Sequence, residues 1–289
     1  MVSRLSALSF GLACGLMAAP ALALDGPFSQ SYPASSLVLV NLAGKVEVAV
    51  GGSGISVQIS GRPDELQAIT VGSNGSTVRI ESNRHHRRID GDAQDFAHFK
   101  IVVPRGADLT IDGVVGEAEI GDVGGRLKLN AGALDGRIGN VSTADLQLSG
   151  SGDLGLGDVA SKLDLNISGS GSLDAGNVDS ADIEIAGSGD VSLKDIRHGL
   201  SAKIAGSGDI GVASVNGPVT AEIAGSGDIS ISRGRADPLK VSIVGSGDFD
   251  FGGEAVNPDV SIYGSGGVRI GSYSGRLQSH GTGDLEIGR

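Results

Sequence analysis

Residues 206–224 read GSGDIGVASVNGPVTAEIA, and this stretch decides the fold. It opens with the tetrapeptide Gly-Ser-Gly-Asp, and apolar residues then alternate with small ones from Ile210 to Val212. After Asn-Gly-Pro, a second alternating run carries Val219, Ala221 and Ile223. Because successive side chains of a strand point to opposite faces, each run predicts a strand with one buried face.

The same tetrapeptide, or a close variant, returns every 17–20 residues. Full copies stand at 150–153, 187–190, 206–209, 225–228 and 245–248, and degenerate copies stand at 169–172, 264–267 and 281–284. A fixed period in this range is typical of a solenoid, in which each repeat forms one coil that rests on the preceding coil. We therefore predict an all-β fold, a parallel β-helix-like solenoid with coils of about 19 residues.

A second corner recurs between the copies of the tetrapeptide. It reads Gly-Asp-Val or Gly-Asn-Val, or in one case Lys-Asp-Ile, at 121–123, 139–141, 157–159, 176–178 and 194–196. We expect the apolar residue to point inward and the Asp or Asn to stack on its counterpart, because these residues bond their own backbone at bends. Counted by these corners, the array has about nine or ten coils.

Residues 24–110 are rich in predicted strands but do not keep the period. Alternating runs occupy 37–40, 46–50, 55–59, 69–71, 78–80 and 99–103. Asn74-Gly75 lies between two of them and predicts a β-hairpin. We interpret 24–110 as an irregular β-rich N-terminal cap, or as a less regular first part of the solenoid, and 111–289 as the repetitive β-solenoid.

The first 23 residues are typical of a secretory signal peptide. Arg4 precedes an apolar run over 5–20, and Ala21-Leu22-Ala23 forms an A-x-A cleavage site. The alternatives are an uncleaved membrane anchor or a lipid anchor on Cys14, the only cysteine. We predict export to the periplasm, the outer surface or the medium, with no transmembrane segment after cleavage and no disulfide in the mature chain.

The charge of the chain limits its partners. The formal net charge is −12, and removal of the leader with Arg4 makes it −13. Such a surface argues against nucleic acid and anionic lipid as partners. We expect a protein or a glycan at a surface, and self-association through the C-terminal edge of the solenoid, because unpaired edges accept strands from other chains.

Four aspartates occupy equivalent corners of consecutive coils and form the one candidate metal site: Asp190, Asp209, Asp228 and Asp248. Stacking brings neighbouring carboxylates to about 5 Å, where their repulsion costs about 1 kcal/mol in water. Solvent, backbone N–H donors or calcium can relieve it. We favour aspartates that cap the turns over a calcium ladder, and expect no other cofactor.

Two other motifs are better explained by the repeat itself. Residues 150–155 and 206–211 satisfy G-x-G-x-x-G, but this fingerprint requires a following helix, and alternating strands follow here. Residues 84–88, RHHRR, form the one basic cluster and precede three aspartates. We interpret this cluster as a solvated loop between strands rather than an anion or metal site.

Residues 204–210 and 223–229 both read IAGSGDI. Together with the leader and the irregular β segment, these repeats resemble the putative auto-transporter adhesin, head GIN domain family of bacterial secreted proteins. The resemblance implies a parallel β-helix-like fold and a role in adhesion at the cell surface, and it supplies no catalytic residues.

We therefore predict a secreted or envelope interaction and adhesion module without catalytic activity. The first alternative is a polysaccharide-acting β-helix enzyme, which would need clustered acids and bases beside aromatic platforms for sugar rings. The chain has eight aromatic residues after the leader and no Trp. The second alternative is a calcium-stabilised structural scaffold of the envelope.

Overall fold

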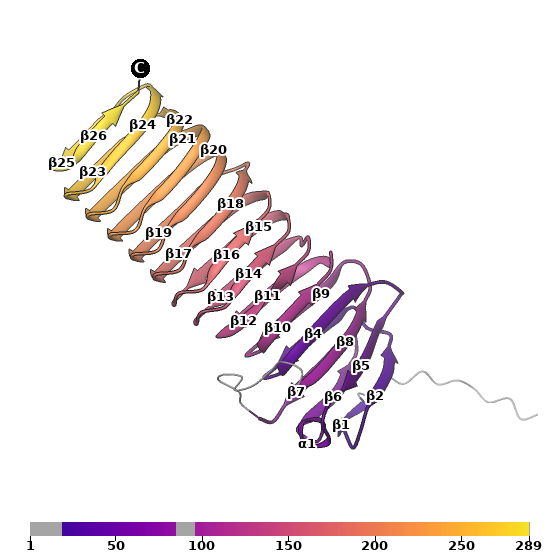
Figure 1. Ribbon diagram of the computed structural model, residues 1–289. Helices are drawn as coiled ribbons and strands as arrows, with labels where there is room; N and C mark the ends of the chain where they lie inside the picture. Colours follow the sequence, from indigo (N-terminus) through magenta and orange to yellow (C-terminus); the bar gives the residue numbers. More distant parts are fainter. Residues whose placement is uncertain (1–18, 85–95, 289) are drawn as a thin grey trace, which may run out of the picture.

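The protein is a straight stack of β-coils (Figure 1). The computed structural model describes residues 19–84 and 96–288. Strands account for 70% of the described residues and helix for 2%, and the coils make about 10 turns spaced about 19 residues apart. The predicted all-β solenoid is confirmed. In the described ranges the one helix is α1 (Pro63–Leu66), and no helix there is long and apolar enough to cross a membrane.

Two long parallel sheets form the main faces of the stack. We call face A the sheet that contains β7 (Thr77–Ser82), β3 (Ser36–Val40), β9 (Ala107–Asp112), β11 (Gly124–Ala131), β13 (Thr143–Leu148), β15 (Val159–Ile167), β17 (Val178–Gly187), β19 (Leu200–Gly206), the second parts of β20 (Ile210–Gly225) and β21 (Ile229–Gly245), β23 (Asp259–Gly264) and β25 (Gln278–Gly281).

We call face B the sheet that contains β8 (Ala97–Val103), β4 (Ala43–Val50), β10 (Val115–Ile120), β12 (Ala133–Ile138), β14 (Asp153–Leu156), β16 (Ser172–Ala175), β18 (Val191–Ile196), the first parts of β20 and β21, β22 (Phe249–Val256), β24 (Gly267–Ser274) and β26 (Asp284–Ile287). In both faces, strands one coil apart pair in parallel. Each coil therefore contributes one strand to each face.

Alternation along the strands fills the core, as the sequence predicts. Ile204, Ile223 and Ile243 stand above one another in successive coils and are at most 2% exposed. The apolar residues of the second corner also point inward: Val123, Val141, Val159, Val178 and Ile196 are at most 2% exposed. These residues form a short third side between face B and face A of the next coil, so the predicted inward position of this corner is confirmed.

The Gly-Ser-Gly-Asp corner is explained by contacts with the coil before it. Gly206 has a φ of +151°, and a Cβ at Gly206 would collide with the carbonyl oxygen of Gly187. A Cβ at Gly208 would collide with the carbonyl oxygen of Gly189 in the same way. The backbone N–H of Ser207 donates to the Gly187 carbonyl over 2.9 Å. The two glycines are therefore required by close backbone approach, which a side chain would prevent.

The first coils do not stack in chain order. The coil of β3 and β4 lies between the coil of β7 and β8 on one side and the coil of β9 and β10 on the other. Residues 36–50 thus form an inner layer of the stack, although they precede the outer layer in sequence. Parallel pairing continues across residue 110, where the sequence predicts a boundary between the N-terminal segment and the repetitive solenoid. The division of the chain into these two parts stays a prediction.

Antiparallel strands complete the N-terminal end of the stack. β5 (Ile55–Ser60) pairs with β8, and β2 (Phe28–Tyr32) pairs with β5. β6 (Ile69–Asn74) and β7 form the hairpin predicted from Asn74-Gly75. β1 (Ala19–Ala23) pairs with β6 and contains the last residues of the predicted leader, whereas residues 1–18 lie outside the described chain.

The C-terminal end differs from the coils before it. In β25 the inward positions are held by Ser279 and Gly281, which stand next to Val260 and Ile262 of the preceding coil. The final described layer therefore buries less apolar surface than the layer it covers.

Candidate functional site

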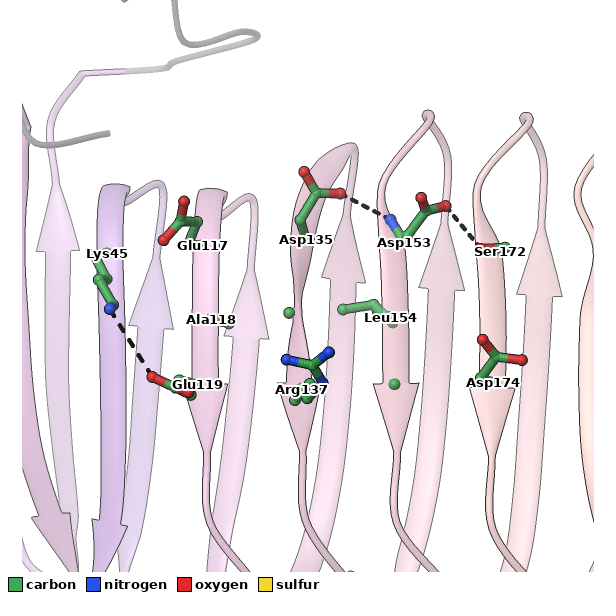
Figure 2. A pocket seen from close by; sticks show the side chains of 12 residues that line it. Lys45, Glu117, Ala118, Glu119, Asp135, Arg137, Asp153, Leu154, Ser172 and Asp174 are labelled. Atoms are coloured by element: carbon green, nitrogen blue, oxygen red, sulfur yellow. Dashed lines mark hydrogen bonds and ion pairs between the residues drawn. The ribbon is translucent and has the colours of Figure 1, made fainter. Parts of the chain in front are cut away.

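Face B carries three described hollows, of about 560, 340 and 360 Å³. The largest crosses β4, β10, β12, β14 and β16 in the N-terminal half of the stack, and the two smaller ones lie over β21, β22, β24 and β26. We call the largest the Arg137 groove. Its charged and hydroxyl-bearing lining residues are Lys45, Glu117, Glu119, Asp135, Arg137, Asp153, Ser172 and Asp174 (Figure 2).

Strand register arranges these side chains in two rows. The first row, which we call the acidic row, starts with Glu117, Asp135, Asp153 and Ser172. The backbone N–H of Asp153 donates to Oδ1 of Asp135 over 2.9 Å, and the hydroxyl of Ser172 donates to Oδ1 of Asp153 over 2.7 Å. Figure 2 shows these contacts along successive strands. The row is therefore held in place by bonds between coils.

The second row contains the groove's free cation. Glu119, Arg137, Gly155 and Asp174 are register partners on successive strands. No hydrogen bond or ion pair of Arg137 occurs among the described residues. A Cβ built on Gly155 would lie 3.6 Å from Cγ of Arg137, so the missing side chain leaves room beside the Arg137 stem. The guanidinium is thus available to a ligand, with Glu119 on the neighbouring strand and Asp174 two strands away on the other side.

The N-terminal end of the groove is a fixed ion-pair cluster. Nζ of Lys45 lies 3.1 Å from Oε1 of Glu47 and 3.9 Å from Oε2 of Glu119. The hydrogen bond from Lys45 lowers the pKa of Glu47, with help from His98, and the same bond raises the pKa of Lys45. Both groups therefore stay charged around neutral pH, and Lys45 is less available to a ligand than Arg137.

The four aspartates predicted as a candidate metal site belong to the same acidic row. All four are exposed. The backbone N–H groups of Asp209, Asp228 and Asp248 donate to Oδ1 of the preceding aspartate over 3.0, 2.9 and 2.7 Å, and Gly267 continues the pattern over 2.7 Å. Each of the four carboxylates, Asp190, Asp209, Asp228 and Asp248, therefore has a backbone donor.

Metal binding by these aspartates stays a prediction. In the part of the chain that the structure describes, no group of three or more His, Cys, Asp or Glu side chains is arranged to hold a metal ion. Sequence reasoning found four members of the row but missed Glu117, Asp135 and the groove beside them. A count of 18-residue steps backward from Asp153 reaches Asp135 and Glu117, so the signal was present in the period.

The second corner forms a ladder of its own. Asn140, Asp158 and Asn177 each donate a backbone N–H to the side-chain oxygen of the preceding Asp or Asn, over 2.8, 2.7 and 2.7 Å. The predicted stacking of Asp and Asn at this bend is confirmed. The ladder stabilises the third side in the same way as the acidic row stabilises the Gly-Ser-Gly-Asp corner.

The remaining sequence motifs have structural explanations or lie outside the described residues. Residues 150–155 and 206–211 lie in corners and strands with no helix after them, so they are not nucleotide-binding loops. Arg84, at the start of the basic cluster, lies 2.7 Å from the carboxylate of Glu65. Residues 85–88 and the three aspartates after them lie outside the described chain.

The fold defines a parallel β-solenoid whose described hollows lie on face B. A family model described as "Putative auto-transporter adhesin, head GIN domain" matches residues 36–234. The chain therefore belongs to this family, and the resemblance seen in the sequence is confirmed. Membership of an adhesin family indicates an exported or surface protein and a non-enzymatic role.

Three solved structures show the range of similar proteins. A putative adhesin from Parabacteroides distasonis is 14% identical, with a TM-score of 0.49, and the match covers 91% of this chain and 98% of that one. A putative lipid binding protein from the same organism is 17% identical, with a TM-score of 0.43 and coverages of 91% and 98%. A putative adhesin from Bacteroides fragilis is 14% identical, with a TM-score of 0.32 and coverages of 92% and 98%. No curated protein matches the chain.

Proposed function

We propose that this protein is an exported adhesion module that binds a surface glycan or protein through face B and catalyses no reaction. The single observation that carries the proposal is the position of the three described hollows, which all open on face B. The strands beneath them are held in register by the acidic row and by parallel pairing, so the binding groups are presented on a rigid surface.

Face A supports this choice by contrast. Its charged side chains form ion pairs with one another. Lys128 lies 3.4 Å from Asp145, Lys162 lies 3.6 Å from Asp182 and Lys203 lies 3.5 Å from Glu184, all across neighbouring strands. Lys162 also lies 3.0 Å from Asp164 on its own strand. On face B, in the described chain, the carboxylates of the acidic row from Glu117 to Asp248 make no ion pair. A ligand can therefore bind the carboxylates of the acidic row without first breaking an ion pair, whereas Arg269 in the smaller hollows is paired with Asp250 and Glu286.

The absence of catalysis in this proposal rests on the chemistry of the groove. A general acid at neutral pH needs a carboxyl group whose pKa is raised. Glu47, which pairs with Lys45 at the end of the groove, has a pKa that the hydrogen bond from Lys45 lowers, so this carboxyl group does not suit the role of general acid. The described lining of the Arg137 groove also contains no aromatic residue on which a sugar ring could stack.

Export in this proposal follows from the leader. Cleavage after Ala23 would release a chain that begins at Leu24, which is buried and whose N–H donates to the carbonyl of Ile69 over 3.2 Å. The new N-terminus would thus stay attached to the fold. Mass spectrometry of the chain recovered from periplasm and from medium tests both the cleavage position and the compartment.

The binding proposal is tested with a double variant in the Arg137 groove, Arg137→Ala with Asp174→Asn. The purified exported chain is applied to immobilised oligosaccharides and to whole bacterial cells, and bound protein is measured as a function of concentration. We expect the variant to lose at least tenfold in apparent affinity, because the free guanidinium and one flanking charge are removed.

The matched control is Lys128→Ala with Asp145→Asn on face A, which removes one cation and one anion from a paired site. We expect this control to bind like the wild type. Equal loss in both variants, or no loss in the groove variant, would show that the Arg137 groove is not the binding site. Release of new reducing or unsaturated ends from the oligosaccharides would show instead that the protein is an enzyme.

A further inference from the structure

The N-terminal end of the sheet that forms face B has an open edge at β2. Every residue of β2 pairs with β5 in one continuous antiparallel register, from Phe28 opposite Ile59 to Tyr32 opposite Ile55. Among the described strands, β2 has no partner on its other side. Within the described chain, one side of its backbone therefore has donors and acceptors that no other strand takes up, which is the arrangement that accepts another strand.

β2 is short and is flanked by Pro27 and Pro33, but within the strand the other features that usually protect an edge are missing. Its sequence, FSQSY, contains no charged residue and no Pro, and its pairing with β5 has no bulge. Ser29, Gln30 and Ser31 are exposed, whereas Phe28 and Tyr32 pack toward the core and fix the strand. At the other end of the same face, β26 carries Asp284 and Glu286. Charges on an edge discourage pairing, so the two ends are not equivalent.

A second copy of this chain is the occupant that fits the β2 edge. An antiparallel pair of identical strands is self-complementary about a two-fold axis, so one edge serves both copies. The acidic row starts several strands away, at Glu117 of β10. Because exposed charges are screened beyond about 10 Å at moderate salt, contact at the N-terminal ends avoids most of the repulsion that two chains of net charge −12 would meet side by side.

We propose that β2 pairs antiparallel with β2 of a second copy, so that the sheet of face B continues from one rod into the other. Pairing centred on Gln30 places Ser29 opposite Ser31 of the partner subunit. Because β2 has only five residues, the dimer is weak and concentration-dependent, as expected of an interface below about 1,200 Å². Such a dimer presents two sets of hollows, which raises avidity for a repeating surface ligand.

Sedimentation velocity of the exported chain over a range of concentrations tests the proposal. In the variant Ser29→Lys with Ser31→Lys, lysines of the two copies face each other, and we expect the dimer to dissociate at least tenfold more readily. In the variant Ser29→Glu with Ser31→Lys, each glutamate faces a lysine of the other copy, and we expect the dimer to return. All substituted positions are exposed, and circular dichroism checks that both variants fold.

The control Gln278→Lys with His280→Lys places lysines on β25, at the C-terminal end. We expect it to dimerise like the wild type. Loss of the dimer in this control, with the β2 variants unaffected, would place self-association at the C-terminal edge and overturn the proposal. A wild-type chain that stays monomeric at every concentration, or a dimer that ignores both β2 variants, would overturn it as well. Binding through the Arg137 groove is measured separately, so the two proposals can fail independently.

Discussion

The N-terminal unit, which we define as residues 19–120, and the array, residues 121–288, build the same stack in different ways. In the array every coil rests on the coil that precedes it in sequence, and the same two corners return each time. In the N-terminal unit the coil of β3 and β4 is inserted between two coils that follow it, and antiparallel strands cover the end. In the array, contacts between coils join residues about one repeat apart in sequence. In the N-terminal unit, the layers that touch are not consecutive in sequence.

This difference indicates what each region contributes. A solenoid coil cannot bury its apolar faces alone, so an array needs a finished surface on which to stack. The inserted coil provides that surface, because it pairs with strands on both of its sides. We infer that the N-terminal unit depends on side-chain packing between layers that are not consecutive in sequence, whereas the array adds close backbone contacts at its corners to the packing of its core.

The largest expected effect is in the inserted coil. Leu39 of β3 is fully buried between β7 and β9. Leu39→Ala removes apolar contacts and leaves a cavity, which costs about 3–4 kcal/mol. Because both neighbouring layers lose their packing partner, we expect the N-terminal unit to unfold as a whole at a lower urea concentration. Urea unfolding followed by circular dichroism measures the loss.

The control for Leu39 is Val38→Ala on the outer side of the same strand, where the side chain is half-buried. We expect it to cost less than about 1 kcal/mol. Similar losses from the two variants would mean that the inserted coil is not a tightly packed layer, and the contrast between the two regions would disappear.

The next effect is at a corner of the array. Gly208→Ala places a Cβ against the carbonyl oxygen of Gly189, and neither backbone can move without disturbing the next coil. Overpacking of this kind costs about 2–3 kcal/mol. We expect limited proteolysis to cut the variant near this corner, while the N-terminal unit stays folded, since coils interact with their nearest neighbours.

Gly211→Ala is the matched control for Gly208. Three residues further along the same coil, a Cβ would meet its nearest neighbour, the Val191 carbonyl oxygen, only at 3.9 Å. We expect a change within about 0.5 kcal/mol, because there is room and the strand gains a side chain. If both variants behave alike, close backbone approach does not explain the repeated glycine.

These two regions also differ in how far the sequence predicts them. The period and alternation of residues 206–224 predict the array, its core and both corners, because each coil repeats the contacts of the last. The insertion of residues 36–50 between later strands has no local signal, since strand 37–40 alternates in the same way whichever neighbours it meets. The hairpin at Asn74-Gly75 was predictable because turn chemistry is local.

The candidate site was predictable only in part. The period places Asp190, Asp209, Asp228 and Asp248 in one row, and their repulsion suggests the need for a partner. The structure shows that this partner is the backbone N–H of the next aspartate in the row. The sequence could not predict the bond, because it depends on the exact register between successive corners. The Arg137 groove forms because Gly155, which has no side chain, lies next to the unpaired Arg137. The two residues are on successive coils, and no sequence motif indicates that they are neighbours.

A smaller effect is expected in the acidic row. Asp209→Ala removes the acceptor for the N–H of Asp228, which costs about 1 kcal/mol. Asp209→Asn keeps an oxygen acceptor and removes one of the stacked charges, so we expect it to match the wild type or to exceed it slightly. Thermal unfolding of the three proteins at neutral pH measures the order.

The same experiment in calcium and in chelator tests the metal alternative. With backbone donors on all four carboxylates, we expect the wild-type unfolding midpoint to be the same in both solutions. A midpoint that rises in calcium, and no longer rises when Asp209→Asn and Asp228→Asn are combined, would establish a metal ladder and make the array the metal-dependent region of the molecule.

The smallest expected effect is on the pH dependence of thermal stability, through the surface carboxylate of Glu254 in the array. The carboxylate of Glu254 accepts hydrogen bonds from Oγ of Ser274 at 2.7 Å and from Arg235 at 2.6 Å, and these donors lower its pKa, Ser274 most. A carboxyl group with a lowered folded-state pKa stabilises the fold above its unfolded pKa, and the stabilisation is lost as the pH falls through the folded value. Glu254→Gln should therefore lower the unfolding midpoint slightly at pH 7 and leave it unchanged near pH 3.

Glu222→Gln is the control, because the carboxylate of Glu222 makes no hydrogen bond or ion pair in the described chain. We expect it to change the midpoint at neither pH. An equal response of the two variants would show that the hydrogen bonds of Glu254 between coils do not make the array pH-sensitive.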